Sequence, residues 1–113
     1  MNRAYLLLAG LHMALIFWFS AQPGESVGIP PPWDKLVHAG VYGLLGYLLV
    51  QGTGRPFFAW SLSVLYGLSD EVHQLFVPGR VFDLGDWLAD AGGAGAVVLA
   101  WGLLSRRRVR LQR

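Results

Sequence analysis

Hydrophobic positions divide the chain into four long apolar segments, separated by short polar or proline-containing stretches. The pattern predicts helices over residues 4–20, 35–51, 57–76 and 84–104. Each segment has roughly the 20 mostly apolar residues that a helix needs to cross a bilayer core of about 30 Å. We therefore expect an all-α membrane protein, a bundle of about four transmembrane helices.

Composition supports a membrane location. Of the 113 residues, 54% are hydrophobic and only 14% are charged, and the mean hydropathy is +0.44. Four crossings use almost the whole chain, so we expect a single transmembrane domain over residues 1–113. The absence of cysteine excludes disulfides, thiolate catalysis and cysteine metal ligands. All five tryptophans lie near predicted segment ends, as an interfacial aromatic belt requires.

Basic residues predict the orientation. Four crossings place both termini on one side, which then carries seven of the nine basic residues: Arg3, Arg55, Arg106, Arg107, Arg108, Arg110 and Arg113. The positive-inside rule makes this side cytoplasmic, with residues 105–113 as a basic cytoplasmic tail. We attribute the tail to topology and anionic lipids rather than to nucleic acid. The bulky residues 17–19 argue against cleavage of the first segment as a signal peptide.

Acidic residues gather at the opposite, outer side. All seven lie in or beyond the outer halves of the segments: Glu25, Asp34, Asp70, Glu71, Asp83, Asp86 and Asp90. Helical spacing aligns polar residues into stripes, which are Asp34, His38 and Tyr42; Tyr66, Asp70, His73 and Gln74; and Asp86, Asp90 and Gly93. Glu71 lies about 100° around its helix from Asp70. Ionisable side chains facing lipid are costly, so the stripes should converge on each other or on a wet cavity.

Small residues should allow this convergence. The second and fourth segments carry Gly40, Gly43, Gly46, Ala89, Gly92, Gly93, Gly95 and Ala96, which would let helices approach closely.

Charge indicates what the cluster binds. Six carboxylates from Asp34 to Asp90 face two cations, Lys35 and Arg80, leaving an excess of four negative charges. Such a cluster must take up protons, bind a cation or receive a cationic headgroup. Histidines among carboxylates suit a divalent metal ion, and we select Asp70, His73 and Asp86 as candidate ligands. The HExxH zinc motif is absent, so this prediction depends on clustering alone.

Structural interpretations compete at several positions. Asp34 could cap the second helix, and Asp83 or Asp86 the fourth. Arg80 could neutralise aspartates or clamp a phosphate. His12 is expected to hydrogen-bond a neighbouring helix.

Four stretches resemble the VanZ-like family of small bacterial membrane proteins: "FSAQPGES", "DKLVHAGVYGLLG", "YGLSDEVHQLFVPGR" and "DWLADAGGAGAV". The resemblance implies a multi-pass protein of the bacterial cell (inner or plasma) membrane, in a family whose founding member is linked to teicoplanin resistance. By position, the family's polar signature falls on Ser20, Gln22, Asp34, Lys35, His38, Tyr42, Asp70, Glu71, His73, Gln74, Arg80, Asp83 and Asp86. Asp90 stands where the family often has Asn, and Ala39 where it often has an aromatic residue.

Three functional hypotheses follow. In the first, an outer-leaflet pocket acts on a lipid or lipid-linked cell-envelope precursor. Its enzyme version assigns proton exchange or metal binding to Asp70, Glu71, His73 and His38. Headgroup contacts come from Ser20, Gln22, Asp34, Lys35, Tyr42, Gln74, Arg80, Asp83, Asp86 and Asp90. The second is a non-catalytic binder of lipid or antibiotic, and the third is a proton-coupled lipid transporter or flippase, for which an oligomer could complete the proton route.

Overall fold

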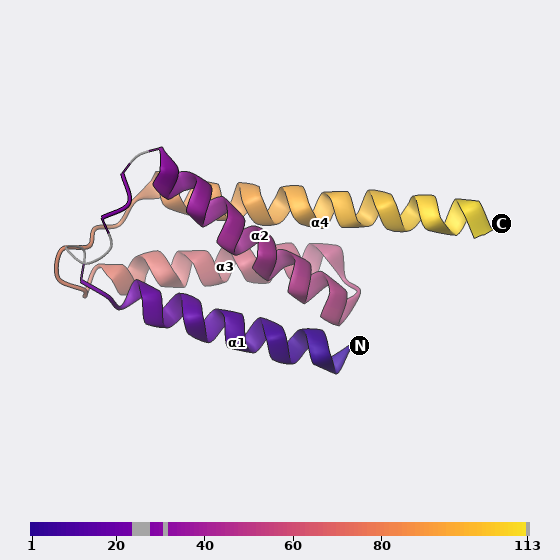
Figure 1. Cartoon of the computed structure of the whole chain (residues 1–113), viewed down its shortest axis with the longest axis horizontal. Coiled ribbons are helices and arrows are strands. Elements are labelled where there is room, and N and C mark those ends of the chain that lie inside the picture. The colour runs from indigo at the N-terminus through magenta and orange to yellow at the C-terminus, as the bar shows by residue number, and fades with distance from the viewer. Residues whose placement is uncertain (24–27, 31, 113) are drawn as a thin grey trace.

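The protein folds into four helices. A computed structural model describes residues 1–23, 28–30 and 32–112, so Glu25, Pro31 and Arg113 lie outside the described residues. The helices are α1 (Arg3–Ser20), α2 (Trp33–Thr53), α3 (Pro56–Gln74) and α4 (Leu84–Gln112). Consecutive helices run in opposite directions, and both termini lie at the same end of the bundle (Figure 1). All regular structure in the described residues is helical, which confirms the all-α prediction.

Local sequence sets the helix ends. The side-chain oxygen of Asn2 accepts hydrogen bonds from the backbone amides of Ala4 and Tyr5 and caps α1. α2 ends where Gly54 takes a left-handed conformation with φ of 68°, which glycine adopts at no steric cost. Pro56 then opens α3, at a position where its missing N–H is not needed.

α4 is longer than predicted. The apolar pattern ends near residue 104, yet the helix continues to Gln112. Residues 105–112 contain no glycine or proline and are rich in arginine, which favours helix. The end of α4 extends past the other three helices (Figure 1). The basic segment is therefore a projecting helix.

Three helices, α1, α2 and α4, are long and apolar enough to cross a membrane. α3 does not meet this criterion because polar residues lower its hydropathy. Four of these residues are nevertheless buried in the bundle: Ser63, Asp70, Glu71 and Gln74. Because these four polar side chains are buried among the helices, α3 suits a crossing, which stays a prediction.

α2 is the central helix and packs against the other three. Its contact with α4 is close because glycines face each other. A Cβ atom on Gly43 would lie 3.4 Å from the carbonyl oxygen of Gly93, and one on Gly46 would lie 3.3 Å from the Cα of Ala94. A Cβ atom on Gly93 would overlap the backbone of Ala39. The predicted close approach of small residues is confirmed here.

The same prediction is wrong at Gly40 and Gly92. A Cβ atom added to either would meet nothing within 4 Å. Gly92 and Gly93 are consecutive, so they point about 100° apart around α4, and only Gly93 faces α2.

Tryptophans fasten the helices to one another. Three indole N–H groups donate to another helix, from Trp60 to the Ala91 carbonyl at 3.1 Å, from Trp87 to the Val64 carbonyl at 3.0 Å and from Trp101 to the Gln51 side chain at 2.7 Å. The sequence predicted these residues only as an interfacial belt. They also join the helices through part-buried hydrogen bonds to two backbone carbonyls and one side-chain amide oxygen.

Candidate functional site

The polar stripes converge at the end of the bundle opposite the termini. His38 Nδ1 lies 2.8 Å from Asp90 Oδ1, and His38 Nε2 lies 3.5 Å from Asp86 Oδ2. The Tyr42 hydroxyl donates to Asp70 at 3.3 Å. Side chains of α2 therefore contact those of α3 and α4, as the helical spacing predicted.

Lys35 is the centre of an outer group of carboxylates. Its ammonium lies 2.8 Å from Asp34, 2.9 Å from Asp83 and 2.7 Å from Asp86. The hydrogen bond from Lys35 holds the pKa of Asp83 below its ordinary range, with help from the backbone amides at the start of α4. Lys35 was predicted to contact a lipid headgroup, and in the structure three carboxylates already surround its charge.

Asp83 caps α4, which confirms one of the competing interpretations. Its Oδ1 accepts from the amides of Gly85 at 2.8 Å and Asp86 at 3.3 Å. Glu71 Oε2 accepts from the Asp83 amide at 3.1 Å, which joins α3 to this cap. The capping interpretation is wrong for Asp34, which lies inside α2, whose N-cap position is Pro32.

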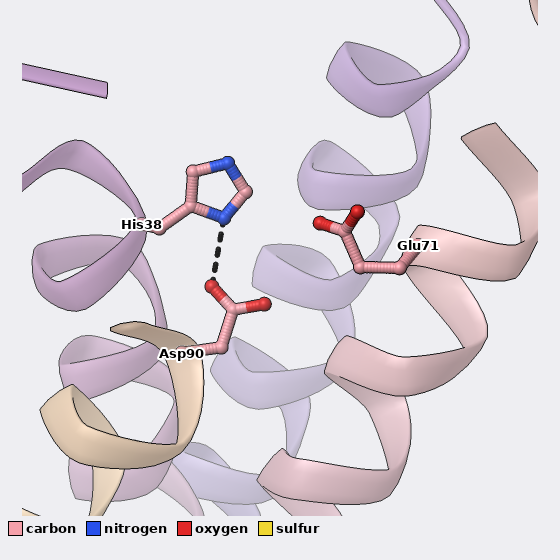
Figure 2. A group of neighbouring side chains, drawn as sticks. All are labelled: His38, Glu71 and Asp90. Carbon is pink, nitrogen blue, oxygen red and sulfur yellow. Dashed lines mark hydrogen bonds and ion pairs between the residues drawn. The ribbon is translucent and has the colours of Figure 1, made fainter. Parts of the chain in front are cut away.

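An inner group consists of His38, Glu71 and Asp90, one residue from each of three helices (Figure 2). Their side chains point toward one another, and one ligand atom from each lies within 4.8 Å of the others. Glu71 and Asp90 are both 0% exposed. Glu71 Oε1 and Asp90 Oδ2 have no hydrogen-bond partner. Two buried carboxylates thus face one imidazole.

The candidate ligands Asp70, His73 and Asp86 are not brought together in this way. In the described residues, potential ligands gather as His38, Glu71 and Asp90, and as Asp34, Asp83 and Asp86. His73 instead lies toward α1, with Nδ1 3.5 Å from the Ser20 hydroxyl and its ring stacked on Phe17. Asp70 and Glu71, consecutive on α3, face different neighbours.

Arg80 links two outer loops rather than neutralising aspartates. Its Nε donates to the carbonyl of Gln22 at 3.0 Å, and an Nη donates to the carbonyl of Phe19 at 3.1 Å. The side chain of Gln22 turns back to the Trp18 carbonyl at 3.0 Å. The predicted pairing of Arg80 with carboxylates is therefore absent from the described part of the chain.

Two adjoining pockets meet at this site. An apolar pocket of about 290 Å³ lies between α1, α2 and α3, against residues such as Leu15, Ile16 and Val41. A polar pocket of about 300 Å³ lies against Asp34, Arg80, Asp83 and Asp86. His38 and Gln74 line both pockets, and Tyr42 and Asp70 line the apolar one.

Sequence reasoning missed the apolar pocket. Its α1 residues look like any lipid-facing positions, and only the fold shows that they border a cavity. His12 gave a partial signal as a polar residue inside an apolar segment. It lines this pocket and donates to the Val41 carbonyl at 2.8 Å, which confirms the expected interhelical hydrogen bond.

The family model described as VanZ/LLP1 matches residues 5–105. This range includes the inner group, the outer group and the helices that line the two pockets. This chain belongs to the VanZ/LLP1 family. Membership confirms the resemblance noted in the sequence and, with the three apolar helices, indicates a membrane protein. A search of curated proteins and a search of solved structures each found no match. The VanZ/LLP1 assignment therefore supplies the family, and the chemistry must be argued from the site.

Proposed function

We propose that this VanZ/LLP1 protein binds a lipid or lipid-linked cell-envelope precursor and acts on its headgroup. The observation that carries the proposal is the pair of adjoining pockets, one apolar and one polar, that share His38 and Gln74. An amphipathic ligand has a hydrocarbon tail that fits the apolar pocket and, joined to it, a headgroup that fits the polar pocket. A small soluble substrate would have no use for the apolar pocket.

The outer leaflet is the expected place of action. The site lies at the end of the bundle opposite the termini, and the basic residues lie mainly near the termini (Figure 1). The positive-inside rule then places the site on the outside of the bacterial cell membrane. Envelope precursors and phospholipid headgroups are accessible there.

His38 is the residue we assign to proton transfer. It lines both pockets, and its two nitrogens face Asp86 and Asp90. Carboxylates beside an imidazole fix its orientation and stabilise its protonated form. Asp70, held by the Tyr42 hydroxyl, is the second acid or base that borders the apolar pocket.

Anion recognition is assigned to Arg80. A guanidinium carries about five N–H donors, and the hydrogen bonds to the Gln22 and Phe19 carbonyls use two groups of Arg80. The others remain for a headgroup phosphate in the polar pocket, which Arg80 lines.

The test combines lipid binding with turnover. Purified protein in mild detergent is incubated with a polyprenyl phosphate, a polyprenyl pyrophosphate or a phospholipid, each with Zn²⁺ or Mn²⁺ present. Native mass spectrometry measures bound lipid, and chromatography measures released headgroup. His38→Gln should keep lipid binding and lower turnover by about 10²–10⁴-fold.

A pair of α1 variants tests the apolar pocket. Leu15→Trp should fill it and weaken lipid binding, whereas Leu7→Trp should bind like wild type. Both leucines are exposed, at 65% and 71%, but only Leu15 lines the pocket. Lipid binding equally strong in all three proteins would contradict the proposal.

Stoichiometric binding without turnover of any of these lipids would favour the non-catalytic lipid- or antibiotic-binding protein. The teicoplanin link stays a prediction, which a susceptible host can test. Expression of wild type should raise the teicoplanin concentration needed to stop growth, and His38→Gln should not.

A further inference from the structure

We propose that His38, Glu71 and Asp90 bind one divalent transition-metal ion, either Zn²⁺ or Mn²⁺. The three residues come from α2, α3 and α4, so the ion would join three helices (Figure 2). This assignment differs from the ligands predicted from the sequence. It does not depend on the identity of the lipid.

The geometry is close to that of a bound ion. Ligands about 2.1 Å from one ion lie at most about 4.2 Å apart. One atom from each of His38, Glu71 and Asp90 lies within 4.8 Å of the others. The three atoms are therefore near enough for one ion to reach all of them with at most small side-chain rotations.

Unpartnered oxygens provide a second, independent observation. Glu71 Oε1 and Asp90 Oδ2 are buried without a hydrogen-bond partner, on side chains that are 0% exposed. Buried polar atoms in native proteins almost always have a partner, and an unpaired buried carboxylate is costly. A cation between these oxygens would satisfy both.

The outer group shows what the inner group lacks. There, the ammonium of Lys35 lies within 2.9 Å of Asp34, Asp83 and Asp86 and supplies the cation. Among the described residues, no lysine or arginine forms an ion pair with Glu71 or Asp90. Asp34 Oδ1 in the outer group is also buried without a hydrogen-bond partner, but the side chain of Asp34 is 22% exposed and its other oxygen pairs with Lys35. The inner group has only His38 to oppose two carboxylates that are 0% exposed.

Donor type selects the metal. One imidazole with two carboxylates suits Zn²⁺ or Mn²⁺ better than Mg²⁺ or Ca²⁺, which prefer an all-oxygen shell. His38 also lines both pockets, so an ion held by this group would lie beside them. With the ion bound, His38 would act as its neutral ligand instead of transferring a proton, and Asp70 would remain as the acid or base.

The experiment measures metal binding to tag-free protein in mild detergent after treatment with EDTA. ZnCl₂ and MnCl₂ are titrated separately, with native mass spectrometry for stoichiometry and thermal unfolding for affinity. Wild type should bind one ion and melt at a higher temperature, because a ligand specific for the folded state stabilises it. The gain should shrink near pH 5, where protons compete for the same ligands.

Variants locate the ion. Glu71→Gln and Asp90→Asn should each weaken binding at least tenfold, and Asp70→Asn should bind like wild type. Asp70 is the matched control because it is a buried carboxylate next to Glu71 on α3 but outside the group. If one variant fails to fold, the other and the wild-type titration still decide.

Two results would overturn the proposal. One is wild-type protein that binds neither ion and melts identically with and without EDTA. The other is loss of binding in Asp70→Asn with retention in Glu71→Gln, which would favour the set Asp70, His73 and Asp86. Lipid binding that persists after a negative metal result would leave the proposed function standing.

Discussion

The carboxylate of Asp83 makes two separate interactions, one with each oxygen. One oxygen caps α4, and the other binds Lys35, so the residue links the start of α4 to α2. Its side chain is 41% exposed, so the ion pair is partly screened by water. The sequence named Asp83 both as a cap and as a headgroup contact, and the structure adds the link to Lys35.

The lowered pKa of Asp83 predicts a pH dependence of stability. Because its pKa is lower in the folded than in the unfolded state, its contribution is complete above about pH 4. The contribution is lost as the pH falls through the folded-state value. Melting of wild type in detergent between pH 6 and pH 3 should therefore fall more steeply than that of Asp83→Asn or Lys35→Met. Parallel curves for the three proteins would show that the ion pair adds no acid sensitivity.

His38 and His73 should differ in their contribution to headgroup turnover. His38 borders both pockets and contacts two carboxylates, whereas His73 stacks on Phe17 and lies outside both pockets. We expect His38→Gln to lower headgroup turnover about 10²–10⁴-fold, and His73→Gln to lower it less than about threefold. Equal losses with equal abundance would restore His73 to the catalytic role predicted from the sequence.

Residue spacing explains why the site was only partly predictable. Spacing placed Asp34, His38 and Tyr42 on one face of α2. The contacts of His38 with α4 and of Tyr42 with α3 agree, whereas Asp34 pairs with Lys35 on α2 itself. It could not decide whether Asp70 or Glu71 meets His38, because the two differ by about 100° and the rotation of α3 depends on packing.

The contact between α2 and α4 should be sensitive to a single added methyl group. Gly93→Ala forces a Cβ atom onto the backbone of Ala39 and should destabilise the protein by about 1–3 kcal/mol. Gly92→Ala is the matched control, since its Cβ meets nothing within 4 Å. It should stabilise the helix by about 0.5–1 kcal/mol. Unfolding in detergent measures both, and equal effects of the two substitutions would contradict this packing.

The four helices were predictable because long apolar runs indicate them and prolines mark several of their ends. The predicted bounds lie close to the observed ones except in α4. There, hydrophobicity stops but helix propensity does not, so an apolar pattern underestimates the length. α3 shows the opposite case. Its inward polar residues lower its hydropathy without shortening the helix.

The topology of the whole molecule stays a prediction with a direct test. An alkaline phosphatase fused after residue 112 should be inactive, because the positive-inside rule keeps that end in the cytoplasm. The same enzyme fused after Arg80 should be active if α3 crosses the membrane. Activity at the C-terminal fusion would reverse the orientation and move the site to the inner side.

His38 and Gln74 line both pockets, so they lie where the apolar pocket meets the polar one. A lipid bound as proposed would be positioned there by the point where its hydrocarbon ends, not by the length of that hydrocarbon. The remainder of a long tail would then extend past the exposed side chains of α1 into the surrounding membrane. The protein would thus select lipids by the first polar atoms that follow the hydrocarbon chain, and it would accept chains of different length.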